Sequence, residues 1–272
     1  MALIIATTDF SGTANNALQY ACNMALANNA DVLVIHCYSV PVSLGDLTIP
    51  MPVSEFKLNA EETMENHIAR LHSDFPQLSI KSEVIYGNVV DAVNDLKNVH
   101  GHPLLVIAGN EYAGVKSSWM DSTLMDAFRK MKYPTLAIPP ETKYTQVRKI
   151  GFACDNNFEG SEDAITKLKD LSLLIGAELH ILYAQKDVHT NDNESDINSK
   201  IKDLLTPAHP MYHYEYEENI DDAIVNFAAK YHLDWLSIMP REHSFLTNLF
   251  RKSHSKALIS NSFIPVLALH ES

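Results

Sequence analysis

The chain has 272 residues, 46% of them hydrophobic, and a formal net charge of -13 at pH 7. This apolar fraction is enough to build a core, so the composition excludes a disordered chain. The acidic balance argues against generic binding to nucleic acid or to an anionic membrane. No apolar run approaches the roughly 18 residues that a membrane helix needs, and the first residues do not form a signal peptide. We therefore expect a soluble, cytoplasmic protein.

Three cysteines, Cys22, Cys37 and Cys154, are spread over the chain. They are too few and too scattered for a disulfide framework or a cysteine-based zinc site. We expect them to be small, buried apolar residues in a reducing compartment.

Apolar runs alternate with helical stripes through the first half of the chain. These patterns predict strands at residues 3–8, 31–37, 80–86, 104–108 and 133–138, and helices at 11–26, 54–72, 89–96 and 122–130. Three prolines between residues 39 and 53 exclude a regular element there and predict a long connection. Strands that alternate with helices predict a parallel sheet covered on both faces.

The same series restarts after a linker at residues 140–146. Here the patterns predict strands at 149–154, 178–183, 212–216, 235–239 and 264–269, and helices at 164–174, from 201 to before Pro207, at 221–230 and after Ser253. The acidic segment 187–199 is typical of a loose loop.

One strand–loop–helix–strand unit occurs twice, and a single constant offset relates the two copies. Residues 104–109 match 235–240, and residues 133–138 match 264–269. The match extends upstream at the same offset, where residues 87–93 correspond to 218–224. This register predicts a tandem repeat with domains at residues 1–140 and 147–272.

Two residues come directly after predicted strands of the first half, Asp9 and Gly109. In an open parallel sheet, ligands bind beyond the carboxyl ends of the strands, so both residues should line one crevice. A glycine loop that leads into a helix offers unpaired N–H groups to a phosphate. The Asp9 carboxylate could accept hydrogen bonds from an adenine amine or a ribose hydroxyl.

Four segments of the first half carry a resemblance to a known family. They are Ile-Ile-Ala-Thr-Thr-Asp-Phe-Ser at 4–11, Tyr-Gly-Asn at 86–88, Ile-Ala-Gly at 107–109 and Tyr-Pro-Thr-Leu-Ala-Ile-Pro at 133–139. With them the chain resembles the universal stress protein (UspA) family, and since both halves fit, it resembles a tandem two-domain member.

The resemblance implies an α/β fold of two tandem, doubly wound, five-stranded parallel-sheet domains of the adenine nucleotide alpha hydrolase-like or Rossmann-like type. It implies that the last strands can pair across a homodimer or across an intramolecular pseudo-dimer. It also implies that some members bind ATP through a glycine-rich loop that ends in Gly-Ser or Gly-Thr.

This chain keeps only part of that loop. The candidate nucleotide crevice of the first half consists of Asp9, Ala108, Gly109, Tyr112, Ser122 and Thr123. Tyr112 stands where the family loop has its second glycine, and Asp121 precedes Ser122 in place of the third. Asp121 could cap the helix itself and would repel a phosphate. We therefore predict weak or absent binding of ATP or AMP, with no metal beyond nucleotide-bound Mg.

The second half offers a weaker candidate, an anion site. Its residues are Asp155, the counterpart of Asp9, and the loop residues Arg241, His243, Ser253 and His254. Pro240 stands at the first glycine position and lacks an N–H donor. The alternative is a solvated basic loop or a contact surface between the halves.

Metal sites and catalytic groups are not indicated. His209 and His213 are four residues apart, but Pro207 and Pro210 prevent the helix that would place them on one face. The chain has no His-Glu-x-x-His motif, and Ser11 is not in a Gly-x-Ser-x-Gly motif. No catalytic residue is predicted.

These observations favour a cytoplasmic universal stress protein that acts as a stress-responsive binding or interaction module without conventional turnover. Protein partners are possible for such a module. The alternative is a stress protein that binds ATP or AMP and hydrolyses ATP slowly. A hydrolase or transferase is a third, weaker alternative.

Overall fold

The computed structural model describes residues 2–40, 52–96, 102–109, 126–154, 162–185, 199–216, 220–239 and 264–270. Within these residues the strands are β1 Ala2–Thr7, β2 Ala30–Tyr38, β3 Ile80–Tyr86, β4 His102–Gly109, β5 Thr135–Ile138, β6 Lys149–Cys154, β7 Glu178–Gln185, β8 Met211–Tyr216, β9 Trp235–Ile238 and β10 Val266–Ala268. The helices are α1 Gly12–Ala27, α2 Val53–Asp74, α3 Val89–Asn94, α5 Glu162–Ile175, α6 Ser199–Leu205 and α7 Ile220–Tyr231, with a short 3₁₀ turn at Thr206–Ala208. Residues 126–130 are also helical.

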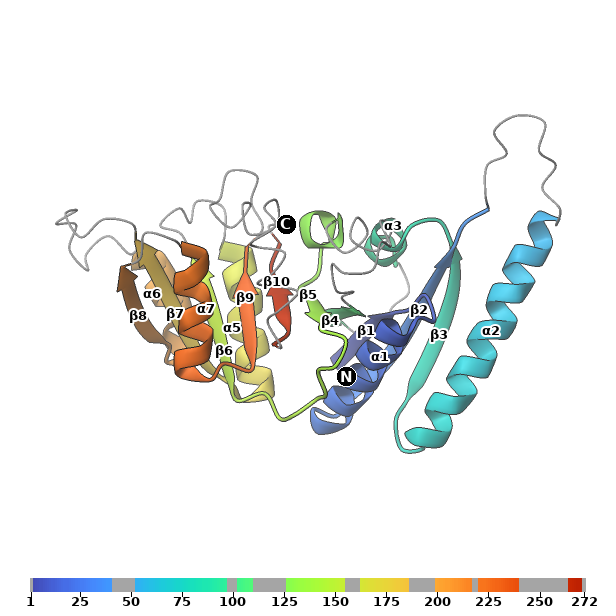
Figure 1. Cartoon of the computed structure of the whole chain (residues 1–272), viewed down its shortest axis with the longest axis horizontal. Coiled ribbons are helices and arrows are strands. Elements are labelled where there is room, and N and C mark those ends of the chain that lie inside the picture. Colours follow the sequence, from blue (N-terminus) through green and yellow to red (C-terminus); the bar gives the residue numbers. More distant parts are fainter. Residues whose placement is uncertain are drawn as a thin grey trace, which may run out of the picture.

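All ten strands lie in one sheet, in the order β3-β2-β1-β4-β5-β10-β9-β6-β7-β8 (Figure 1). Every neighbouring pair is parallel except β5 and β10, which are antiparallel and place Leu136 opposite Leu267. Read inward from the β3 edge, the strands of the first half are the third, second, first, fourth and fifth in chain order. Read inward from the β8 edge, the strands of the second half follow the same order. The predicted α/β class with a doubly wound, mostly parallel sheet is confirmed.

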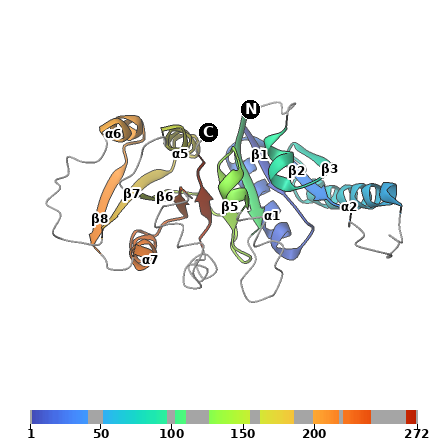
Figure 2. The ribbon, with the colours of Figure 1, turned by 90° about the horizontal axis from the view of Figure 1, so that it is seen from above.

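Helices cover both faces of this sheet, because alternate side chains of the strands point to opposite faces and both sets are apolar. In β1, Ile4 belongs to a core cluster with α1, α2, α5 and α6, whereas Ile5 packs in a second cluster with Val90 and Val93 of α3. A third cluster contains Phe227 of α7. Figure 2 shows α5 and α6 on one side of β6–β8 and α7 on the other side.

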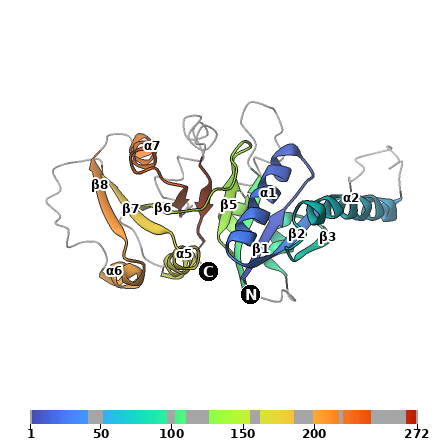
Figure 3. The same ribbon diagram turned by 90° about the horizontal axis from the view of Figure 1, so that it is seen from below.

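The boundaries of the elements follow from local chemistry. Ser11 caps α1 by accepting a hydrogen bond from the Ala14 N–H at 3.2 Å, and Asn88 caps α3 by accepting from the Asp91 N–H at 2.9 Å. Helix α2 begins directly after Pro52 and lies at the end of the molecule farthest from β8 (Figure 3). Helix α3 ends at Asn94, a little earlier than its pattern predicted.

The remaining predictions on elements agree with the structure where it describes them. Helices α3 and α7 begin at residues 89 and 220, and strands β5 and β10 begin at 135 and 266, so both pairs keep the offset of the repeat. The prolines around His209 do exclude an α-helix, since His209 has φ 47° and His213 lies in β8. Most of the connection at 39–53, the loop at 187–199 and the helix after Ser253 lie outside the described residues. None of the helices in the described part of the chain is long and apolar enough to span a membrane.

The two halves of the sheet are tied together by side chains as well as by β5 and β10. The indole Nε1 of Trp235 in β9 donates to the hydroxyl of Tyr20 in α1 at 2.7 Å. Two further hydrogen bonds join the halves. His270 Nδ1 donates to the carbonyl of Tyr133 at 3.1 Å, and Lys167 Nζ donates to the carbonyl of Lys132 at 3.2 Å.

Candidate functional site

The candidate crevice lies at the carboxyl ends of β1 and β4. These strands are paired, so Asp9, just after β1, and Gly109, the last residue of β4, come to the same edge of the sheet. The sequence predicted this placement. The prediction used only the rule that parallel strands place their carboxyl ends on the same side of a sheet, and it did not depend on a contact between the two residues.

Asp9 is exposed, and one of its carboxylate oxygens is already used within the loop. The backbone N–H of Ser11 donates to Asp9 Oδ1 at 2.9 Å. This is the side-chain-to-backbone turn in which Asp commonly substitutes for a backbone acceptor. Asp9 therefore shapes the connection between β1 and α1.

Gly109 is required by close packing of backbones. A Cβ atom built on this residue would lie 2.8 Å from the carbonyl carbon and oxygen of Thr13 and 2.9 Å from the nitrogen of Ala14. Such distances are shorter than carbon can tolerate, so a side chain at this position would push β4 and the first turn of α1 apart. Ala108, beside it, is half-buried. The glycine that the sequence assigned to a phosphate loop has a packing role.

A ring cluster that the sequence analysis missed lies beside Asp9. Phe10 has φ 66°, a left-handed conformation that costs energy in a residue with a bulky side chain. In this conformation its ring centroid lies 4.4 Å from that of His36 in β2 and 5.7 Å from that of His67 in α2. The N–H of Phe10 donates to Thr8 Oγ1 at 3.0 Å, which helps to hold this turn.

The two histidines of this cluster differ in their hydrogen bonds. His36 Nδ1 is 2.8 Å from the carbonyl oxygen of Thr8, and since a carbonyl only accepts, Nδ1 carries the proton. In the neutral ring, Nε2 of His36 is then a hydrogen-bond acceptor. Burial, with a smaller effect of Arg70, lowers the pKa of His67, so its ring is neutral at pH 7. Among the described residues, His67 Nε2 is buried without a hydrogen-bond partner.

A carboxylate, an imidazole and an aromatic ring thus lie together at the ends of β1 and β2. The other predicted residues of this site, Tyr112, Ser122 and Thr123, lie outside the described residues, as does Asp121. So do all the residues of the predicted anion site, Asp155, Arg241, His243, Ser253 and His254. In the part of the chain that the structure describes, no group of three or more His, Cys, Asp or Glu side chains could hold a metal ion.

His213 has a partner that the sequence analysis did not identify. Its Nε2 lies 3.1 Å from Nδ1 of His180, on the neighbouring strand β7, and the two rings are stacked. Tyr231 of α7 covers this pair, with its ring centroid 4.1 Å from that of His213. Only the parallel register of β7 and β8 brings the two histidines together, since they are 33 residues apart.

The prediction that the cysteines are buried holds for Cys22, whereas Cys37 is half-buried. Burial raises the pKa of the Cys22 thiol to about 12 and that of the half-buried Cys37 thiol to about 11. At pH 7 both are protonated, and a protonated thiol is a poor nucleophile. The side chain of Cys154 lies outside the described residues.

The fold and the crevice define a doubly wound α/β protein with its candidate site at the carboxyl ends of parallel strands. The model of the universal stress protein family matches residues 2–139. The match covers half of the chain, and the chain belongs to the universal stress protein family.

Solved structures share the fold over nearly the whole chain. A universal stress protein from Archaeoglobus fulgidus DSM 4304 is similar with a TM-score of 0.71 and 14% identity, covering 99% of this chain and 98% of that one. A putative universal stress protein from Pseudomonas aeruginosa UCBPP-PA14 has a TM-score of 0.57 and 13% identity, covering 98% and 91%. The cytoplasmic domain of a prokaryotic cation chloride cotransporter has a TM-score of 0.58 and 9% identity, covering 99% and 95%. No curated protein matches the chain.

Proposed function

We propose that this protein is a tandem universal stress protein of the cytoplasm that acts as a stress-responsive binding or interaction module. The observation that carries the proposal is the hydrogen bond from the Ser11 N–H to Asp9 Oδ1. The Asp9 carboxylate is the group that would hold a nucleoside, and this hydrogen bond gives it a structural role in the β1–α1 turn. The Phe10 ring, tilted against that of His36, adds bulk at the same end of the sheet.

The tandem arrangement is part of this proposal. It is supported by the constant offset that relates the starts of α3 and α7 and the starts of β5 and β10, and by the strand order that repeats from both edges of the sheet. In this arrangement the two halves form an intramolecular pseudo-dimer through β5 and β10. Surfaces outside this pairing remain for protein partners.

A second function is favoured by one further observation. Because Nδ1 of His36 bonds to the Thr8 carbonyl, Nε2 of the neutral ring could accept a hydrogen bond from an adenine amine. Together with the predicted loop residues Ser122 and Thr123, this supports an alternative in which ATP or AMP binds and ATP is slowly hydrolysed. The Tyr112 and Asp121 substitutions weigh against tight binding.

Calorimetry with Mg-ATP and with AMP on the full chain separates the two functions. We expect no sub-micromolar binding by the parent protein, because Tyr112 adds bulk and Asp121 adds negative charge to the loop. The double variant Tyr112→Gly/Asp121→Gly should bind more tightly than the parent if the rest of the crevice is competent. Sub-micromolar binding by the parent would overturn the proposal in favour of the nucleotide-binding alternative.

The Asp9→Asn variant identifies the role of the carboxylate in the same experiment. The amide oxygen of Asn can still accept from the Ser11 N–H, so the turn is kept while the charge is removed. If Asp9 binds a nucleotide directly, the variant should lose affinity by the roughly 1–3 kcal/mol expected for hydrogen bonds to a charged group. If Asp9 only shapes the turn, the affinities of parent and variant should agree.

A further inference from the structure

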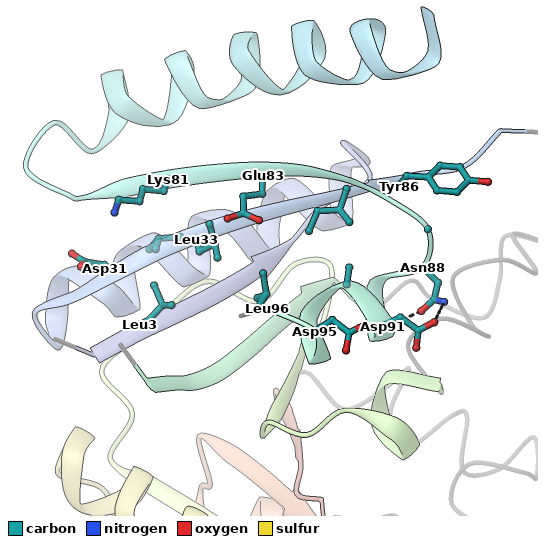
Figure 4. Close-up of a pocket in the computed structure, with 14 residues that line it drawn as sticks. Leu3, Asp31, Leu33, Lys81, Glu83, Tyr86, Asn88, Asp91, Asp95 and Leu96 are labelled. Atoms are coloured by element: carbon teal, nitrogen blue, oxygen red, sulfur yellow. Dashed lines mark hydrogen bonds between the residues drawn. The ribbon is translucent and has the colours of Figure 1, made fainter. Parts of the chain in front are cut away.

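A cavity of about 540 Å³ opens on the face of the sheet that carries α3 (Figure 4). Four of its residues give it an apolar lining: Leu3, Leu33, Ile85 and Leu96. Neither Asp9 nor Gly109 lines it, so it is separate from the crevice at the ends of β1 and β4. Its volume is within the range of pockets that bind small molecules.

The cavity exists because α3 is short. This helix has six residues, whereas α7, which follows the edge strand of the other half, has twelve. Helix α7 places Tyr231 over His180 and His213 and so covers β7 and β8. Helix α3 ends at Asn94, and part of the face of β2 and β3 beyond it is left as the cavity.

The wall that α3 provides is held in place from outside the cavity. The side-chain amide of Asn94 donates to the carbonyl of Lys130 at 2.9 Å, and its oxygen accepts from the N–H of Lys132 at 2.9 Å. These two bonds fix the end of α3 to the segment that leads into β5. A pocket whose wall is fixed before binding loses little conformational entropy when a ligand enters.

The charged residues that line the cavity are mostly acidic. Its carboxylates are Asp31, Glu83, Asp91 and Asp95, and the ammonium group among its lining residues is that of Lys81. Figure 4 shows Lys81 and Asp31 toward one end of the cavity, and Asp91 and Asp95 toward the other.

Within the described residues, none of these four carboxylates is in an ion pair. Asp91 accepts from the Asn88 amide at 2.5 Å. Glu83 and Asp95 are exposed. Among the described residues that line the cavity, four carboxylates and one ammonium group therefore lie next to an apolar surface.

We propose that this cavity is a binding site for a small organic cation with an apolar body. The ammonium group would lie between Glu83 and Asp95, where both carboxylates attract it. The apolar body would lie on Leu3 and Leu33 and would be removed from water there. This site is independent of the proposed function, because its residues belong to another part of the fold.

Three probes of the same size but different charge test the site on the full chain. They are phenylbutylamine, phenylbutanol and phenylbutyrate, titrated into labelled protein and followed by the amide resonances. We expect the amine to bind about fivefold more tightly than the alcohol, and the anion to bind least, since each ion pair at an exposed site adds little. The shifted resonances should be those of Gly87, Ala92 and Leu96, with Asp9 and Gly109 unchanged.

A matched pair of variants identifies the charges responsible. Glu83→Gln/Asp95→Asn should abolish the preference for the amine, whereas Glu62→Gln/Glu65→Gln on α2 removes the same charge elsewhere and should keep it. Circular dichroism confirms that both variants are folded. Equal binding of the three probes, no binding of the amine up to its solubility limit, or an unchanged preference in the first variant would each overturn the proposal. A basic helical peptide that binds this face when the amine does not would overturn it too, in favour of a protein partner.

Discussion

The indole N–H of Trp235 donates a hydrogen bond to the hydroxyl oxygen of Tyr20 over 2.7 Å, across 215 positions of sequence. Both side chains are buried, and Tyr144 packs edge-on against the Tyr20 ring. Burial raises the pKa of Tyr20, so the hydroxyl stays protonated at any physiological pH. This bond joins helix α1 of the first half to strand β9 of the second.

Removing this hydroxyl should destabilise the whole protein. In Tyr20→Phe, the Trp235 N–H loses its acceptor in a place that water does not reach, which costs about 1–3 kcal/mol. Urea denaturation measures the change in the free energy of unfolding. Tyr86→Phe is the matched control, because the Tyr86 ring is 67% exposed and its loss of a hydroxyl should change little. Equal stabilities of the two variants would show that the bond adds nothing.

Adding one methyl group at the end of β4 should separate two backbones. In Gly109→Ala the new Cβ would lie 2.8 Å from Thr13, and we expect a loss of about 1–3 kcal/mol from overpacking. The control is Gly12→Ala in the first turn of α1, where a Cβ would have no neighbour within 4 Å. Thermal unfolding of both variants tests this. A Gly109→Ala protein as stable as the control would contradict the packing role of this glycine.

The His180–His213 pair should make stability depend on pH. Burial lowers the pKa of both rings, and for His213 the neighbouring His180 lowers it further. Because the unfolded rings take up protons at a higher pH than the folded ones, the stabilisation is complete above the ordinary histidine pKa and is lost as the pH falls below it. Protonation of both rings would also leave their shared hydrogen bond without an acceptor.

The comparison of urea unfolding at about pH 7.5 and about pH 5.5 measures this dependence. The charged groups around the pair are Glu178 and Lys149 on strands β7 and β6, Glu215 on β8 and Lys230 on α7. They are all kept in the double variant His180→Phe/His213→Phe, which should lose less stability on acidification than the parent. An equal loss in both proteins would assign the dependence to other groups, such as His67 and His270, whose pKa values burial also lowers.

The first half alone should form a dimer through β5. In the full chain, β5 is fully buried and pairs antiparallel with β10. Without the second half, β5 would be an exposed apolar edge, which pairs readily with a second copy. Light scattering after gel filtration should show a dimer for the fragment 1–140 and a monomer for its Leu136→Arg variant. A folded, monomeric fragment would weaken the proposal of a pseudo-dimer.

Much of the secondary structure could be predicted from the sequence alone, because it depends on local patterns. The continuous apolar run of β1 indicates a strand buried on both faces, and the Ser11 cap and the apolar stripe after it indicate α1. The patterns predicted α7 from 221 and β10 from 264, and these elements begin at 220 and 266, at the same offset from α3 and β5 that relates the two copies in the sequence. The placement of Asp9 and Gly109 at one edge of the sheet also followed, because parallel strands put their carboxyl ends on the same side.

The tertiary structure decided which residues that are far apart in the chain come together. Register between neighbouring strands, which no local pattern fixes, brought His180 to His213, and the packing of α1 against β4 gave Gly109 its role. The cavity beside α3 depends on where that helix ends relative to the strands under it, a difference of a few residues that an apolar stripe does not define. These features arise from contacts made only once the sheet has formed, because side chains then meet according to their positions in space and no longer according to their spacing in the sequence.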